Sequence, residues 1–354
     1  MLWRLTINPV TMKFYFTLAS TLLTGIIMFC SCSTSSRKNV ERLTLRPTAV
    51  ILDSMFTQMP GSLFLYDQYL VWQDPFNPDY FLHVVDIDAK KEIGVMGEFG
   101  RGPKEFNMPS LAKSIGNKIF AYDLNLDQQA YYSIDSLLAG KDPFISYPLH
   151  PIENCLSIVQ IAENEFISTQ PENEHPFQWI HADSSITFFG KCPIKEKIND
   201  YYSARQGPLV YNPYNQTLVY STNHLSYIAL YEKKDRTFQL KWEKRPIKKS
   251  YEVKDGNIHF LHNEELPLGI VLTKDYIVAL QQDKDTEFPT MKRTSGIRDF
   301  STVPTTLLVY DYDFNLKKII NMGMPTLRIE GNGATNTLYT VGIDLDFCIL
   351  RYEL

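Results

Sequence analysis

Two histidines three residues apart are the side chains whose spacing most directly suggests a metal ion. His259 and His262 could place two imidazoles side by side. A zinc protease motif, however, puts a glutamate directly after its first histidine, whereas here 263–265 (Asn-Glu-Glu) follows the second. The chain also contains no G-x-S-x-G segment of the kind that carries a hydrolase serine. We therefore predict no catalytic residues and no metal ligands from these motifs.

Paired acids offer a second kind of chemistry. Asp86 and Asp88 lie in one expected hairpin, and Asp311 and Asp313 lie in another. They could bind calcium, but their repetition at equivalent turns favours a role in which aspartate binds its own backbone. Two carboxylates for glycoside hydrolysis stay open, because their sequence spacing would not reveal them. We predict no cofactor, with a calcium or zinc ion in a central channel as the alternative.

The N-terminal segment has the features of a secretion signal. Met12 followed by Lys13 makes a suitable start, and residues 14–29 contain no charged side chain. This run is shorter than the ~20 residues that a membrane-spanning helix needs. We therefore predict a removable signal peptide over residues 1–32, with Met12 as the true start.

The end of this segment predicts a lipid attachment site. Small Ser31 precedes Cys32, as lipid transfer to a thiol and cleavage before it require, whereas Cys30 follows bulky Phe29. We predict lipidation at Cys32 and a flexible polar tether over residues 33–42. The partner through this end of the chain would be a membrane.

Composition narrows the other partners. The net charge of −5 argues against nucleic acid, which calls for a basic surface. Beyond Cys30 and Cys32 the cysteines are Cys155, Cys192 and Cys348, whose odd number and long spacings indicate neither a disulfide framework nor a zinc site. We expect buried free thiols in a monomer and leave a bond between Cys155 and Cys192 open.

The positions of these residues depend on a series of short strands. Apolar, β-branched or aromatic runs bounded by Asp, Asn, Gly or Pro recur along the chain, which indicates an all-β fold. Residues 85–97 and 310–323 share one pattern: a strand, an acidic hairpin and a strand that ends in Met-Gly. Such units predict the four-stranded blades of a six-bladed β-propeller over residues 43–354. Blade ends are expected near Gly97, Leu149, Gly190, Arg245 and Gly323.

The last blade is too short by one strand. It would begin near Thr326 and hold about three strands before Leu354. We predict that residues 43–51 supply its outer strand, so that the N-terminal strand closes the ring and leaves no open edge.

Residues 97–109 connect the first two blades. Their pattern, G-x-x-G-x-G-P-x-x-F-x-x-P, resembles the junction between blades in NHL-like propellers and in the six-bladed TolB-like propeller lipoproteins of Bacteroidota. Glycines permit positive φ in such a crossing, and Phe106 could fix the loop to the core. The resemblance implies a lipid-anchored protein of the cell envelope. Because the residues after Cys32 lack the acidic cluster that directs such lipoproteins to the outer surface, we expect the outer membrane, facing the periplasm.

The propeller assignment also predicts a binding face. Loops from an outer strand to the next inner strand share one face with loops from the second to the third strand of a blade, and ligands commonly meet propellers there. Residues 283–304 form the longest such loop. We predict a non-enzymatic binding or scaffolding module for a protein, peptide or glycan; the alternative is an envelope hydrolase or lyase with a metal in the channel. The candidate face residues are Asp79, Tyr80, Arg101, Lys104, His175, Phe177, Lys292, Arg293 and Arg298.

Overall fold

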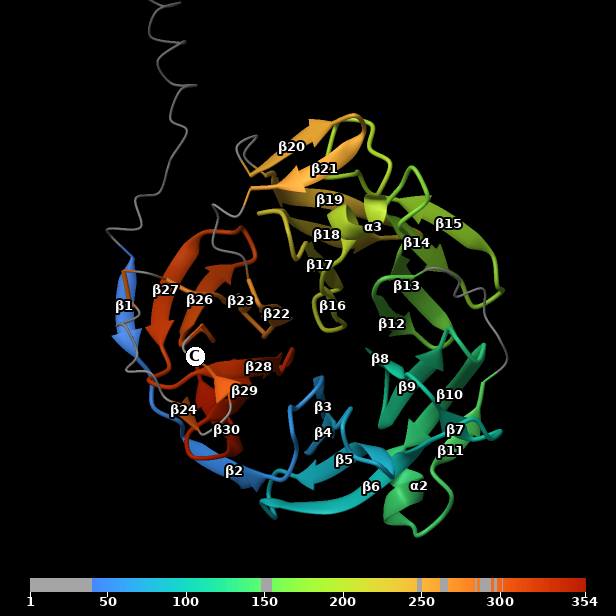
Figure 1. Cartoon of the computed structure of the whole chain (residues 1–354), viewed down its shortest axis with the longest axis vertical. Helices are drawn as coiled ribbons and strands as arrows, with labels where there is room; N and C mark the ends of the chain where they lie inside the picture. Colours follow the sequence, from blue (N-terminus) through green and yellow to red (C-terminus); the bar gives the residue numbers. More distant parts are fainter. Residues whose placement is uncertain are drawn as a thin grey trace, which may run out of the picture. The chain divides into compact units, whose positions relative to one another are not determined.

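Antiparallel four-stranded sheets arranged as blades around a central axis make up the structure, a computed structural model (Figure 1). It describes residues 40–147, 155–246, 250–261, 267–283, 285–286, 294–295, 298–300 and 302–354. The predicted signal peptide, Cys32, Lys292 and Arg293 lie outside these residues. Glu41–Leu354 forms one compact unit. Within the described ranges no helix is long and apolar enough to cross a membrane.

The first three blades follow one another along the chain, each from its inner to its outer strand. Blade one comprises β3 (Leu63–Tyr66), β4 (Tyr69–Gln73), β5 (Tyr80–Asp86) and β6 (Lys91–Phe99), with β7 (Glu105–Phe106) added parallel to β6. Blade two comprises β8 (Ser110–Lys113), β9 (Lys118–Asp123), β10 (Gln128–Ser133) and β11 (Phe144–Ser146). Blade three comprises β12 (Ile158–Ala162), β13 (Glu165–Thr169), β14 (Phe177–Ile180) and β15 (Ile186–Phe189).

The second half of the ring repeats this order with additions. Blade four comprises β16 (Leu209–Asn212), β17 (Thr217–Ser221), β18 (Ile228–Lys234) and β19 (Thr237–Lys244). Blade five comprises β22 (Gly269–Leu272), β23 (Tyr276–Leu280), β26 (Thr306–Asp311) and β27 (Leu316–Asn321). Blade six comprises β28 (Thr326–Gly331), β29 (Thr337–Ile343), β30 (Phe347–Glu353) and the N-terminal β2 (Ala49–Met55).

The predicted closure of the ring is confirmed, with a shift in its boundaries. The closing strand is β2, whose Ala49 pairs with Arg351 and whose Met55 pairs with Phe347 in the antiparallel register. The predicted segment 43–51 begins too early in the chain, because its first residues belong to another strand. That strand is β1 (Glu41–Thr44), which pairs in parallel with β27 of blade five. Two residues that the sequence assigns to the tether, Glu41 and Arg42, therefore begin the folded unit.

Several elements were not foreseen. The hairpin of β20 (Tyr251–Lys254) and β21 (Asn257–Phe260) lies between blades four and five, and a second, short hairpin of β24 (Thr294–Ser295) and β25 (Arg298–Asp299) lies in the long loop of blade five. Two one-turn helices also occur, α2 (Ile134–Leu138) and α3 (Tyr201–Arg205).

The blade ends fall close to where the repeat predicts them. β6 ends at Phe99, β15 at Phe189, β19 at Lys244 and β27 at Asn321. The predicted end at Leu149 lies outside the described residues. The core consists of the apolar faces that neighbouring blades press together, as between blades one and two, where Phe81, Phe106 and Tyr132 are buried against one another.

Candidate functional site

The antiparallel order of each blade divides the connections of the ring between two faces. Loops from second to third strands, and from an outer strand to the next inner strand, lie on one face, which we call the loop face. The turns between first and second strands, and between third and fourth strands, lie on the other, which we call the turn face. The described candidate residues from the sequence lie in or next to loops of the loop face.

A buried aspartate organises the loop face where blade six meets blade one. Asp74 directly follows β4 and is almost completely buried. One of its carboxylate oxygens, Oδ1, accepts hydrogen bonds from the Thr57 hydroxyl at 2.8 Å and from the backbone N–H of Phe76 at 2.9 Å. The loop after β2 and the turn after β4 are thereby tied to one carboxylate.

Asp123 has the same position and role one blade further on. It ends β9, is buried, and its Oδ2 accepts the backbone N–H groups of Asn107 at 2.8 Å and Met108 at 2.7 Å. Its Oδ1 accepts those of Asn125 at 2.9 Å and Leu126 at 3.2 Å. Four backbone donors of two loops thus converge on one side chain, which holds both loops in a fixed position.

Blade three uses a cation instead of an anion. The buried guanidinium of Arg205, in α3, donates to the backbone carbonyls of Gln170, Asn173 and Glu174. It also lies 4.5 Å from the ring centre of Tyr201. The turn of blade three that contains His175 is therefore fixed from the neighbouring loop.

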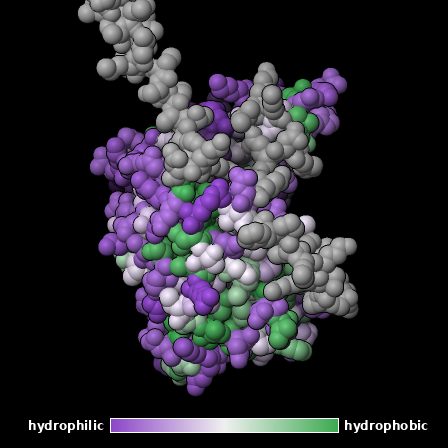
Figure 2. All heavy atoms as spheres, turned by 90° about the vertical axis from the view of Figure 1, so that its left-hand side faces the viewer, coloured by the Kyte–Doolittle hydropathy of each residue, from purple (hydrophilic) through white to green (hydrophobic). Residues whose placement is uncertain are grey.

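Large apolar side chains project from consecutive loops of this rigid frame. They come from the loops of blades six, one and two, and the two most exposed are Phe56, at 102%, and Leu345, at 90% of the reference area. We call the following set the apolar rim: Phe56, Phe76, Met108, Leu124 and Leu345. Single exposed apolar residues are ordinary on protein surfaces, whereas several on one face make that face a candidate interaction site. Apolar residues also gather among polar ones on the side of the ring formed by β1, β2 and β27 (Figure 2).

The junction of residues 97–109 combines residues that pack in the core with residues that are exposed. Gly97 has φ of +79°, and a Cβ at this position would lie 2.5 Å from the Phe81 ring, so that only glycine fits. Phe106 is buried against Phe81, as the sequence predicts. Arg101 is exposed. Lys104 is also exposed and forms an ion pair with Asp142.

The remaining candidates divide into exposed, buried and undescribed residues. Asp79 and Tyr80 are exposed and lie beside the junction, because the backbone N–H of Phe99 donates to the Asp79 carbonyl at 3.2 Å. His175 is exposed on blade three, with its Nδ1 3.0 Å from the Gly190 carbonyl.

Phe177 is a correction to the predicted binding face. It is 0% exposed, because as the first residue of β14 it packs edge-on against the rings of Tyr220 and Tyr231. The third strand begins at this residue, so its side chain already follows the pleat into the core. Arg298 lies in β25, and its side chain is not among those described. The sequence does not predict the apolar rim, because the candidate face residues were chosen among charged and aromatic side chains of several loops.

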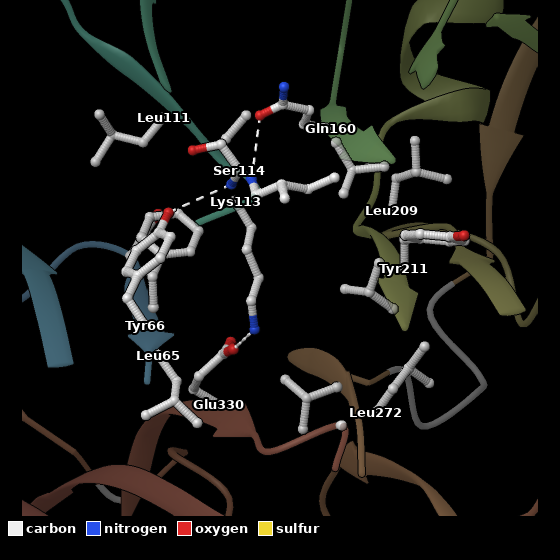
Figure 3. Close-up of a pocket in the computed structure, with 18 of the residues that line it drawn as sticks. Leu65, Tyr66, Leu111, Lys113, Ser114, Gln160, Leu209, Tyr211, Leu272 and Glu330 are labelled. Atoms are coloured by element: carbon white, nitrogen blue, oxygen red, sulfur yellow. Dashed lines mark hydrogen bonds and ion pairs between the residues drawn. The ribbon is translucent and has the colours of Figure 1, made fainter. Parts of the chain in front are cut away.

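The channel through the ring is the second candidate site. It has a volume of about 760 Å³ and is lined by the six inner strands. Lys113, the last residue of β8, reaches across it to form an ion pair with Glu330 of β28 (Figure 3). The Lys113 side chain is 35% exposed and that of Glu330 only 10%. Burial raises the pKa of Glu330, although Lys113 acts in the opposite direction.

Neighbouring polar groups in the channel are engaged with the backbone. The Tyr66 hydroxyl accepts the backbone N–H of Ser114 at 3.4 Å, and the Gln160 side-chain oxygen accepts that of Ile115 at 3.1 Å (Figure 3). Leu65, Leu111, Leu209 and Leu272 supply aliphatic surface. The channel is thus a cavity lined by both aliphatic and polar groups, with one ion pair.

The residues described here do not fit a metal ion in the channel. No three His, Cys, Asp or Glu side chains among them lie close enough together to hold one. The acids in the channel lining are Asp67 and Glu330. Lys113 already occupies the cation position beside Glu330. We therefore derive no chemistry through a channel metal.

The three cysteines of the propeller are free thiols. Cys155 and Cys348 are buried, and Cys192 is partly exposed. The bond between Cys155 and Cys192 that the sequence leaves open is therefore not formed in this structure.

Comparison with known proteins supports the fold. The model of a family described as TolB-like 6-blade propeller-like matches residues 43–329. No curated protein matches the chain. A Bacteroides fragilis protein described as exported is similar in structure, at 12% identity and a TM-score of 0.53, over 87% of this chain and 93% of that one. Regucalcin from Agrobacterium tumefaciens, described as calcium-binding, is similar at 9% identity and a TM-score of 0.50, over 88% and 96%. At these identities the solved structures show a shared fold alone.

Proposed function

Because this chain belongs to the TolB-like six-bladed propeller family, we propose that it is a lipid-anchored module of the cell envelope that binds a partner protein through its loop face. The apolar rim is the observation that carries this proposal. Its side chains come from five consecutive loops, and at least four of these loops are tied to the buried carboxylates of Asp74 and Asp123. Such fixed loops lose little conformational entropy when a partner binds.

The chemistry of the rim favours a protein over a glycan. Phe, Met and Leu side chains contribute to binding by excluding water from apolar surface, at about 1.5–3 kcal/mol for each side chain that becomes fully buried. A protein partner can offer a matching apolar surface, whereas a glycan requires polar groups beside its aromatic contacts. Asp79, Arg101 and Lys104 would then form a polar border around the apolar contact, as protein interfaces have.

The entry of the chain into the ring supports an orientation. β1 runs parallel to β27, and β27 runs from the turn face toward the loop face, so Glu41 lies at the turn-face end of β1. If Cys32 carries lipid, a tether of about eight residues, averaging roughly 16 Å as a coil, precedes Glu41. In the proposed anchored protein, the turn face would then lie toward the membrane and the apolar rim toward the periplasm.

Co-purification of matched variants tests the binding surface. Phe56→Ser combined with Leu345→Ser should remove the partner that co-purifies with the lipidated protein, without lowering the melting temperature, because both side chains are exposed. The control combines Ile115→Ser with Tyr214→Ser, which removes exposed apolar side chains from the turn face. An equal loss in both pairs, or retention of the partner in the first pair, would contradict the proposal.

A separate experiment tests the anchor. Labelled palmitate should enter the wild-type protein and the Cys30→Ala variant, but not Cys32→Ala. Incorporation into Cys32→Ala would show that the lipid is attached elsewhere or that the protein is not anchored in this way.

A further inference from the structure

We propose that the central channel is a binding site for a small amphipathic carboxylate, whose head group contacts the Lys113 ammonium and whose apolar body lies against the channel wall. This site is separate from the partner surface of the loop face. It rests on three properties of the cavity: its size, its wall and the arrangement of its single ion pair.

The size and the mixed lining of the channel suit a small amphipathic molecule. A volume of about 760 Å³ is in the range of small-molecule sites. Leu65, Leu111, Leu209 and Leu272, from four different blades, contribute to its lining beside polar residues such as Ser114 and Gln160 (Figure 3).

The ion pair provides a positively charged group in the channel lining. An ammonium group has three N–H donors, and the one acceptor that the described side chains offer Lys113 is Glu330. Lys113 is the more exposed partner of the pair, so an incoming molecule meets its free donors before it meets the carboxylate behind them. Among the described lining residues Lys113 is the only cation. An acceptor head group is therefore recognised here, and a cationic one is not.

The other charge in the lining does not change this assignment. Asp67 lies in the turn between β3 and β4, at the turn-face mouth of the channel, and is exposed to solvent. Charges in such positions are screened by water and salt. Lys113, the last residue of β8, is only 35% exposed, so its charge is screened less than that of Asp67.

Three dansylated or naphthyl probes test the proposal on the chain from residue 33, which retains the whole compact unit Glu41–Leu354. Dansylaminoundecanoic acid carries a carboxylate, a dansylated alkylamine carries a cation and N-phenylnaphthylamine is uncharged. Fluorescence titration should show saturable binding of the acid, at least tenfold tighter than binding of the amine.

Variants of the ion pair make the test specific. Lys113→Met should weaken binding of the acid by about tenfold or more, as loss of a charge-assisted hydrogen bond predicts, and leave N-phenylnaphthylamine unaffected. Glu330→Gln removes the competing carboxylate and should tighten binding of the acid several-fold. Lys104→Met, which removes an exposed lysine of the loop face, is the matched control and should change neither. A melting curve of each variant checks that it is folded.

Three results of these titrations would overturn the proposal. They are failure of the acid to saturate the wild-type protein, equal binding of the acid by wild type and Lys113→Met, or tighter binding of the amine than of the acid. Variants of the apolar rim should leave the probe affinities unchanged, so that failure here is distinguishable from failure of the partner surface.

Discussion

The carboxylate of Asp123 accepts the backbone N–H of Met108 at 2.7 Å, and this contact links a buried anion to a loop whose side chain projects into solvent. The same carboxylate fixes the turn that contains Leu124, through Asn125 and Leu126. The loops that contain the exposed side chains of Met108 and Leu124 are therefore held in place by hydrogen bonds to a buried carboxylate. A surface of this kind is preorganised for contact.

Removing the Asp123 carboxylate should destabilise the fold. Asp123→Ala leaves four backbone donors without their acceptor, and we expect a loss of about 2–4 kcal/mol in the free energy of unfolding. Urea denaturation measures this loss. The control is Asp79→Ala on the same face, whose side chain is exposed and which should stay within about 0.5 kcal/mol of wild type. Similar effects of the two variants would show that Asp123 does not anchor the loops.

The two members of the channel ion pair should respond differently to substitution. Lys113→Met leaves a deeply buried carboxylate without its cation, which should cost about 3–5 kcal/mol. Glu330→Gln leaves an ammonium that still contacts channel water, so its cost should stay below about 1 kcal/mol. Denaturation at neutral pH compares them, and equal costs would contradict the burial argument.

The loss of folding stability in Lys113→Met should depend on pH. Burial raises the pKa of Glu330 in the folded state above its ordinary value, and loss of Lys113 raises it further. A carboxyl group whose folded pKa is raised loses stability as the pH rises through that pKa, because the folded state binds the proton more strongly. Lowering the pH from about 8 toward 5 should therefore reduce the difference in the free energy of unfolding between Lys113→Met and wild type. A difference that does not change with pH would contradict the view that the unpaired Glu330 carboxylate causes the loss of stability.

Ring closure can be tested at two adjacent residues of β2. Ile51 is buried between blades six and one, whereas the neighbouring Val50 points outward and is 46% exposed. Ile51→Ala should cost about 2–5 kcal/mol, and Val50→Ala should stay within about 0.5 kcal/mol. Thermal unfolding of both variants provides the comparison. A stable Ile51→Ala protein would mean that the closing strand contributes little.

The blades and their hairpins could be predicted because their causes are local. Asp86 accepts the backbone N–H groups of Asp88 and Ala89 within its own turn, and Asp311 does the same for Asp313 and Asn315. Such contacts span a few residues, so the sequence displays them directly. They support the assignment of these acids to turn chemistry.

The site residues depend on contacts that the sequence does not display. Lys113 and Glu330 lie 217 positions apart and meet only because blades two and six face one channel. Phe177 and Phe76 both border loops of the same face, yet one is buried and the other exposed. Their burial differs because Phe177 already belongs to a strand and Phe76 does not. The ends of strands are the part of a structure that is hardest to predict from sequence.

Thiol labelling should separate the three cysteines of the propeller. Burial raises the pKa of the Cys155 and Cys348 thiols to about 11, so few of them are ionised at pH 8. In the folded chain from residue 33, Cys192 should react with a chromogenic disulfide within minutes and the other two only after unfolding in denaturant. Rapid reaction of all three in the folded protein would contradict the described burial.

Site-specific photo-cross-linking tests the central claim most directly, because it reports contact in the living cell at chosen side chains. A benzophenone amino acid would replace Leu345 or Phe76 on the loop face, and Tyr214 or Ile115 on the turn face, in the lipidated protein. Irradiation should yield one discrete protein adduct from positions 345 and 76 and none of that size from positions 214 and 115. Absence of the adduct from the loop face, or its appearance from the turn face instead, would contradict a partner surface formed by the apolar rim.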